Sequence, residues 1–194
     1  MIFVPGSITA FFSPEIHEDP LKSGSLGVGI TINKGVRARC LGNGEKNEGK
    51  TEITVNGEAW DFPTVRYVVE KLGGGRISVS MELPVGCGFG MSGASALAAA
   101  FEVASTRGIN APFSRLADLA HEAEVINRTG LGDVVSQSHG GVVARLSPGS
   151  PSIARVERFL WDAELEFLVL GKLDTSEILE SSLTSIQREG KACL

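Results

Sequence analysis

The sequence has few of the features that mark several classes of protein. Its three cysteines, Cys40, Cys87 and Cys193, lie far apart and form no Cys-x-x-Cys pair, which argues against a disulfide framework and a structural zinc site. No stretch approaches the roughly 18 apolar residues that a membrane helix needs, and the apolar start of the chain carries no basic leader. We therefore expect a cytoplasmic protein with no membrane partner.

Positive charge is also scarce. The formal net charge is -5 and no dense run of Lys or Arg occurs, so we expect no nucleic-acid partner. What is present is ordinary for a globular protein, because 42% of the 194 residues are hydrophobic, which is enough to bury a core. This length predicts one large domain, or one domain and part of a second.

The pattern of apolar residues predicts a mixture of strands and helices. Up to about residue 60 the apolar segments are short, and Asn56-Gly57 is typical of a hairpin turn. Later segments predict helices at 63–72, 94–106, 114–127 and 176–188, and strands at 77–81, 142–146 and 165–170. Because no regular βαβ rhythm appears, the predicted fold class is α+β rather than a doubly wound sheet.

A glycine-rich segment from Gly86 to Ser92 lies between a predicted strand and an alanine-rich helix. Glycines let a ligand approach the backbone closely, and free N–H groups at a helix start attract an anion such as a triphosphate. The segment is not a Walker loop, since no Gly-Lys-Ser/Thr follows, and Met91 breaks the dinucleotide-binding pattern. The alternative is a glycine-rich connector that binds no ligand.

This segment resembles the second motif of the GHMP kinases, which include galactokinase, homoserine kinase and mevalonate kinase. It reads Pro84-Val85-Gly86-Cys87-Gly88-Phe89-Gly90-Met91-Ser92-Gly93-Ala94 and departs from the usual motif at Phe89, Met91 and Gly93. Three further strings extend the resemblance along nearly the whole chain, toward the archaeal pantoate kinase branch: Pro5-Gly6-Ser7-Ile8-Thr9, Gly24-Ser25-Leu26-Gly27-Val28-Gly29 and Thr129-Gly130-Leu131-Gly132-Asp133-Val134-Val135.

The resemblance implies a fold, a reaction and two cofactors. The fold is a two-layer α+β domain with a largely antiparallel sheet over residues 1–160, followed by the beginning of a second domain at 161–194. The reaction transfers a phosphoryl group from ATP, with Mg²⁺, to pantoate in coenzyme A biosynthesis. Another small hydroxy acid, such as shikimate or homoserine, is an alternative acceptor, and a non-catalytic nucleotide-binding relic is an alternative from a different class. The implied ATP-binding residues are Pro84, Gly86, Gly88, Phe89, Gly90, Met91, Ser92 and Gly93.

The resemblance also assigns roles to individual polar residues. Ser92 and Glu124 are expected to hold magnesium, and Asp133 to face the acceptor hydroxyl as the catalytic residue. For Ser92 and Asp133 the alternative is helix capping, which suits both residue types. For Glu124 it is a solvated position on a helix surface.

Four residues are expected to line the acceptor pocket: Ser25, His121, Arg145 and Thr175. Arg145 has an independent physical case, because an arginine can bind the carboxylate of pantoate with two parallel hydrogen bonds. Its alternative is an exposed arginine on a strand. For His121 the alternative is a structural histidine, and for Thr175 it is capping of the last helix.

The chain departs from the family in two places. Ser7 stands where several GHMP kinases have a lysine, and no third glycine-containing motif follows Thr175. We therefore expect an apolar surface after about residue 160 that drives self-association into a homo-oligomer. We also expect weak or absent kinase activity from the chain as given.

Overall fold

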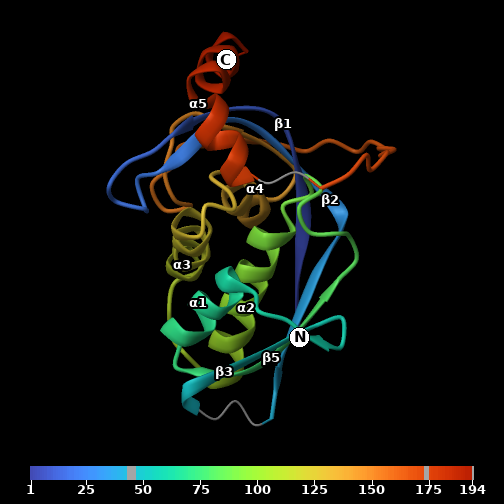
Figure 1. Cartoon of the computed structure of the whole chain (residues 1–194), viewed down its shortest axis with the longest axis vertical. Helices are drawn as coiled ribbons and strands as arrows, with labels where there is room; N and C mark the ends of the chain where they lie inside the picture. The colour runs from blue at the N-terminus through green and yellow to red at the C-terminus, as the bar shows by residue number, and fades with distance from the viewer. Residues whose placement is uncertain (43–46, 173–174, 194) are drawn as a thin grey trace.

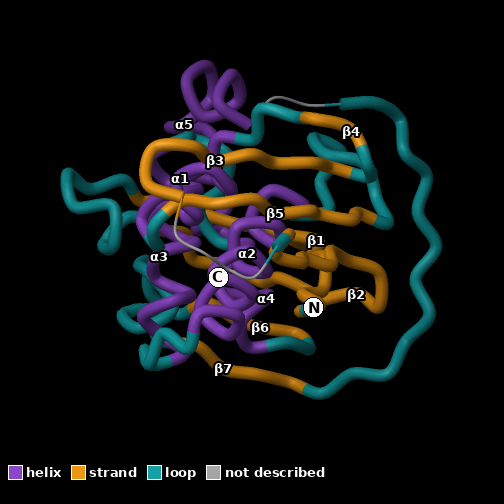
Figure 2. The backbone as a smooth tube through the Cα atoms, turned by 90° about the horizontal axis from the view of Figure 1, so that it is seen from below, coloured by secondary structure: helices purple, strands orange, loops and turns teal. Residues whose placement is uncertain are grey.

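The computed structural model describes residues 1–42, 47–172 and 175–193. Over these residues a seven-stranded sheet forms one layer and helices form the other (Figures 1 and 2). In chain order the elements are β1 (Ile2–Glu15), β2 (Gly24–Leu41), β3 (Asn47–Val55), β4 (Glu58–Ala59), α1 (Pro63–Lys71), β5 (Gly74–Met81), α2 (Met91–Arg107), α3 (Phe113–Ile126), α4 (Asp133–His139), β6 (Val142–Arg145), β7 (Val156–Phe159) and α5 (Thr175–Ala192). The predicted α+β class is confirmed.

The sheet is organised around the long strand β2. One edge of β2 pairs antiparallel with β1 along its whole length, from Ile2 opposite Ala38 to Glu15 opposite Gly24. The other edge pairs first with β6 and then with β5, both antiparallel. The β3–β5 ladder is parallel, whereas β4 and β7 extend the two ends antiparallel. The expectation of a largely antiparallel sheet is therefore also confirmed.

The main core lies between the sheet and helices α1, α2 and α3. Helix α2 is rich in alanine, and most of its residues are buried. Its small side chains let the sheet and both flanking helices approach closely. From the sheet, Val36, Ile77 and Val79 pack against it and are fully buried. Helix α2 is thereby held with its N-terminus at the end of the β5–α2 loop, which positions the glycine-rich segment.

The C-terminal part differs from the sequence-based expectation. The strand predicted at 165–170 is wrong: residues 160–172 have no regular structure, and Leu168 and Leu170 are 83% and 89% exposed. A strand needs a neighbour for its ladder, and after β7 no described segment pairs with this one. Helix α5 then packs back against β1, where Gln187 Nε2 donates to the Pro14 carbonyl at 2.9 Å. The division of the chain at about residue 160 stays a prediction.

Within the described residues, no helix combines the length and the hydropathy that crossing a bilayer would require.

Candidate functional site

The glycine-rich loop joins β5 to α2 and has an open backbone. Gly86, Gly88 and Gly90 adopt φ values of +78°, +81° and +61°, which favour glycine. A Cβ added to Gly88 would meet no atom within 4 Å, so a ligand can reach this part of the loop. Gly90 is the N-cap of α2 and no side chain caps the first turn. The loop and the helix start therefore present backbone N–H groups to an anion.

The loop residues divide into exposed and buried sets. Pro84, Gly86 and Gly88 are exposed, whereas Phe89 and Met91 are 6% and 2% exposed and face the protein interior. The Phe89 ring makes an edge-to-face contact with Phe167, with 5.7 Å between the ring centroids. Phe89 and Met91 can therefore contact a nucleotide through their backbone only, which is a restriction on the sequence-based prediction.

Glu124 lies on α3 behind the loop, with its side chain buried. Its Oε1 accepts a hydrogen bond from Thr129 Oγ1 at 2.6 Å, and its carboxyl group also interacts with the Ser92 hydroxyl. Burial raises the pKa of Glu124 to about 7; the hydrogen bonds from Ser92 and Thr129 oppose this shift and the nearby Asp133 adds to it. Glu124 is therefore not a solvated helix-surface glutamate, and a cation beside it would favour its charged form.

Asp133 begins α4 and is partly buried. The N-cap of α4 is Gly132 and no side chain caps the helix, so the alternative of Asp133 as an N-cap is not observed. Its Oδ1 accepts a hydrogen bond from Ser7 Oγ at 2.8 Å. Burial raises the pKa of the Asp133 carboxyl, and the Ser7 hydrogen bond and the Arg145 charge oppose the shift. Ser92 likewise does not cap α2, and its hydroxyl lies 3.1 Å from Thr64 Oγ1.

Arg145 comes from β6 and is 1% exposed, which excludes the exposed-arginine alternative. Its Nε donates to the Ser25 carbonyl at 3.1 Å and its Nη1 to Ser136 Oγ at 2.7 Å. Burial lowers the pKa of the guanidinium and the Asp133 charge opposes this. A Cβ on Gly132 would stand 2.5 Å from Ser25 Oγ and 2.8 Å from Arg145 Cζ, so only glycine allows this close approach.

The other predicted acceptor residues are His121, which lies on α3, and Thr175, at the start of α5. The His121 ring is fully buried on α3, and its Nε2 lies 2.8 Å from the Ser23 carbonyl. His121 and Arg145 thus hold the backbone carbonyls of Ser23 and Ser25, at the start of β2. Burial lowers the pKa of His121, which favours the neutral ring. Thr175 is the first residue of α5, but its side chain lies outside the described part of the structure.

Two further residues join the site that the sequence reasoning did not select. Ser7 contacts Asp133 through its side chain, and its backbone N–H donates to the Phe89 carbonyl at 3.0 Å. Gln137 Nε2 lies 2.8 Å from the Gly90 carbonyl and 3.0 Å from Ser7 Oγ. A signal existed for Gln137, because a residue four positions after Asp133 lies on the same helical face.

The side chains around the loop offer few ligands for a magnesium ion. In the described part of the chain, no group of three or more His, Cys, Asp or Glu side chains is arranged to hold a metal. A magnesium ion that arrives with a nucleotide takes most of its oxygen ligands from phosphates and water, and needs one or two from the protein. The Glu124 carboxylate beside the Ser92 hydroxyl fits that smaller demand in chemistry and position.

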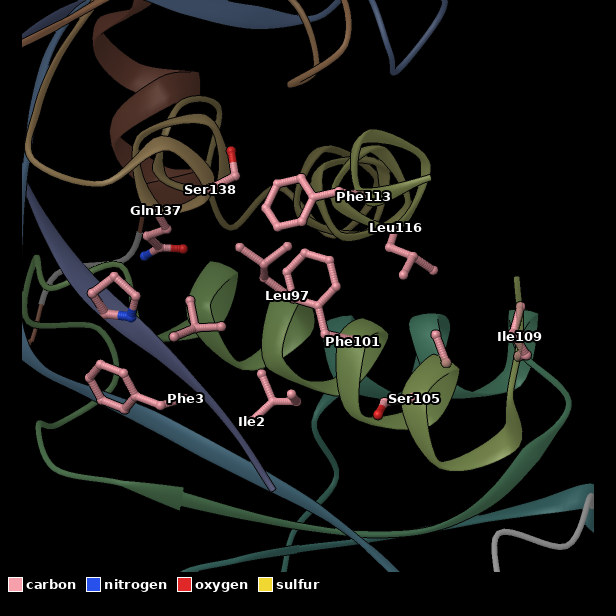
Figure 3. Close-up of a pocket in the computed structure, with 13 residues that line it drawn as sticks. Ile2, Phe3, Leu97, Phe101, Ser105, Ile109, Phe113, Leu116, Gln137 and Ser138 are labelled. Carbon is pink, nitrogen blue, oxygen red and sulfur yellow. The ribbon is translucent and has the colours of Figure 1, made fainter. Parts of the chain in front are cut away.

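An apolar cavity of about 560 Å³ lies beside the N-terminal half of β1, and Gln137 and Ser138 of α4 form part of its lining (Figure 3). Leu97 and Phe101 of α2 and Phe113 of α3 point into it, and the Phe101 and Phe113 rings stack with 4.7 Å between centroids. The cavity lacks the charged groups that a triphosphate or a hydroxy acid requires. We therefore place the functional site at the polar cluster, not here.

The chain is similar to a known family and to proteins of known activity. The family described as "GHMP kinases N terminal domain" matches residues 59–141, a range that includes the loop, Glu124 and Asp133. A pantoate kinase of Thermococcus kodakarensis is 36% identical over 203 residues, covering 99% of this chain and 67% of the relative. One of Methanocaldococcus jannaschii is also 36% identical over 203 residues, covering 100% and 71%.

A solved structure described as "Phosphotransferase related to CoA biosynthesis pathway" is 34% identical, with a TM-score of 0.77. The match covers 99% of this chain and 66% of that one. The chain thus spans about two thirds of the length of the relatives that it matches.

Proposed function

Because this chain belongs to the GHMP kinase family, on the branch of the pantoate kinases, we propose that it transfers a phosphoryl group from ATP to pantoate. The products are 4-phosphopantoate and ADP, in coenzyme A biosynthesis. The observation that carries the proposal is that the open glycine loop lies beside two carboxylates, the buried Glu124 and the partly buried Asp133. Ser7 contacts both the loop, through the Phe89 carbonyl, and the Asp133 side chain.

The nucleotide phosphates are assigned to the backbone N–H groups of residues 86–90 and to the first turn of α2. Such groups, together with the positive end of the helix dipole, are suited to an anion. Ser92 and Glu124 would hold the magnesium ion. When bound, magnesium supplies charge neutralisation on the phosphates, which is a main requirement of phosphoryl transfer.

Asp133 is assigned to the acceptor hydroxyl. One carboxylate oxygen is engaged by Ser7, and the other is available to accept the hydrogen of the attacking hydroxyl and to take its proton. Arg145 supports the charge of Asp133 and fixes Ser25. A guanidinium has five N–H donors, and those that Ser25 and Ser136 do not use can meet the pantoate carboxylate. Ser25 and Thr175 are also assigned to the acceptor pocket, as is His121, whose ring contacts the Ser23 carbonyl just before Ser25.

The acceptor is tested by ADP release with pantoate, shikimate and homoserine as alternatives. We expect turnover with pantoate to exceed that with the other two acids. All three carry a carboxylate for Arg145, but they differ in where the hydroxyl lies relative to it, and a wrong hydroxyl position is costly. Equal rates with all three would contradict pantoate as the substrate. ATP binding without any acceptor-dependent release would support the nucleotide-binding relic instead.

The nucleotide site is tested by Gly88→Val. The new side chain would extend into the space that we assign to the phosphates, and we expect affinity for an ATP analogue with magnesium to fall by about 10–100-fold. The matched control is Gly57→Val in the β3–β4 turn, which also has a positive φ, +92°, and open space around its Cβ position. Calorimetric titration measures both. Equal affinities in the two folded variants would show that the loop does not hold the phosphates.

Self-association is proposed through the apolar segment at 160–170. Leu160, Leu168 and Leu170 are more than four-fifths exposed, and contiguous exposed apolar surface tends to be buried by association. We expect light scattering coupled to size exclusion to give the mass of a homo-oligomer, and Leu168→Glu/Leu170→Glu to lower it to that of a monomer. Ile16→Glu, at an exposed isoleucine on the β1–β2 connection, is the control. A monomer before any substitution would contradict this proposal.

A further inference from the structure

We propose that Gln137 is a positioning residue, which fixes the Ser7 hydroxyl as a donor to Asp133 and ties Asp133 to the end of the glycine loop. Gln137 lies on α4, one turn beyond Asp133, and is 5% exposed. Its Nε2 contacts the Gly90 carbonyl at 2.8 Å and Ser7 Oγ at 3.0 Å. The kinetic part of the inference rests on the proposed function, but its geometry does not.

The hydrogen bonds of this cluster have only one consistent direction. The Gly90 carbonyl can only accept, so the atom of Gln137 that faces it must be the amide nitrogen. The same nitrogen has no lone pair to offer, so it donates its second hydrogen to Ser7 Oγ. The hydrogen of Ser7 is therefore left for Asp133 Oδ1, 2.8 Å away. Rotating the amide by half a turn would place two carbonyl oxygens against each other at Gly90.

The cluster is closely packed where it faces the loop and the start of α2, although Gln137 also forms part of the lining of the apolar cavity beside β1. A Cβ on Gly90 would stand 2.5 Å from Ser7 Oγ and 2.6 Å from Gln137 Nε2, and one on Gly93 would stand 3.1 Å from Gln137 Oε1. That Oε1 atom has no hydrogen-bond partner among the described residues. Burying a carbonyl without a hydrogen-bond partner is unfavourable. The position of the Gln137 side chain is therefore explained by the two hydrogen bonds that its nitrogen donates, not by its oxygen.

The consequence for the proposed reaction is a defined state of Asp133. The hydrogen bond from Ser7 favours the carboxylate over the protonated acid, against the effect of burial on its pKa. It also occupies Oδ1 and leaves Oδ2 for the acceptor hydroxyl. Because Ser7 and Gln137 both contact the loop, through the carbonyls of Phe89 and Gly90, the carboxylate and the phosphate site are held in one fixed relation.

The kinetic test compares Gln137→Met, Ser7→Ala and the double variant in the ADP-release assay. Methionine keeps the volume of glutamine and removes both donors. We expect each single variant to lower kcat about tenfold, with the KM for pantoate changed less than about twofold. If Gln137 acts through Ser7, the double variant should lose no more than the worse single one.

The matched control is Ser138→Ala. Ser138 is the neighbour of Gln137 on α4, but its side chain leaves the helix in another direction (Figure 3) and donates to the Val135 carbonyl of its own helix. We expect its kcat to be unchanged. If Gln137→Met does not fold, Gln137→Glu keeps the shape, cannot donate from the carboxylate and should lose at least as much turnover.

A second readout needs no activity. In nitrogen-15 spectra of the free protein, the Gln137 side-chain amide should exchange slowly with water, and Ser7→Ala should speed that exchange about tenfold by freeing one donor. Unchanged exchange, additive losses in the double variant or a normal kcat in Gln137→Met would each overturn the inference. A chain without pantoate-dependent turnover would contradict the proposed function alone, and the amide exchange would still decide the geometry.

Discussion

Asp133→Asn should lower kcat for pantoate phosphorylation by about 10²–10⁴-fold, the typical effect of losing a positioned base. Asparagine keeps the shape and removes the charge, so the Ser7 hydroxyl still has an acceptor while the proton of the attacking hydroxyl does not. Affinity for an ATP analogue should stay within about threefold of the unchanged chain, since the proposed phosphate contacts come from the loop backbone. The ADP-release assay gives kcat, and calorimetric titration gives the affinity.

Asp118→Asn is the control for this variant. Asp118 is also a buried aspartate that accepts from a serine hydroxyl, Ser152 Oγ at 2.7 Å, but it lies on α3 away from the loop. It should affect thermal stability and leave kcat close to normal. Near-normal turnover in Asp133→Asn would limit Asp133 to orienting its neighbours. An equal loss in both variants would mean that the effect comes from folding.

The ligand-free chain should lose stability as the pH rises from about 4.5 to above 7, because of Glu124. The pKa of this carboxyl is raised from 4.5 to about 7 in the folded chain, so between these values the folded state binds a proton that the unfolded state has released. The contribution is fully present below pH 4.5 and is lost as the pH rises through 7. This rise in the pKa of Glu124 from 4.5 to about 7 corresponds to about 3 kcal/mol of unfolding free energy.

Glu124→Gln should remove the Glu124 contribution to this dependence, while Asp133, whose pKa is also raised, and His121, whose pKa is lowered, keep theirs. Urea unfolding at pH 4.5, 6 and 8 should show the variant and the unchanged chain close together at pH 4.5, and the variant more stable by up to about 3 kcal/mol at pH 8. Glu18→Gln, at an exposed glutamate, is the control and should follow the unchanged chain. Parallel profiles for Glu124→Gln and the unchanged chain would show that Glu124 ionises normally in the folded state.

Several elements could be predicted from the sequence because their signals are local. The alanine-rich run predicted at 94–106 is α2, and the segment predicted at 114–127 is α3, each within a few residues. The Asn56-Gly57 turn was also predicted, and both residues have the positive φ that this pair tolerates. In each case the residues that carry the signal are the residues that form the element.

Other features could not be predicted, because they depend on partners elsewhere in the chain. The apolar run at 165–170 satisfies a strand pattern, but a strand forms only where another strand completes its ladder. Ser92 and Asp133 have the composition of helix caps, yet in the folded chain Gly90 and Gly132 occupy those positions. Helix α4 itself was not predicted, since its seven residues are too short for a periodic pattern.

The sequence by itself determined the family of this protein, its fold class and the glycine loop, because motif residues and periodicity are read along the chain. Only the tertiary structure decided the environment of the carboxylates. Ser7 and Asp133 are 126 residues apart, and Gln137 and Gly90 are 47 apart. They meet because β1 pairs with β2 and α4 packs against β1, and the register of a sheet is set by all of its strands together. The pKa of Glu124 and the direction of the hydrogen bonds at Asp133 therefore follow from packing, which no local pattern records.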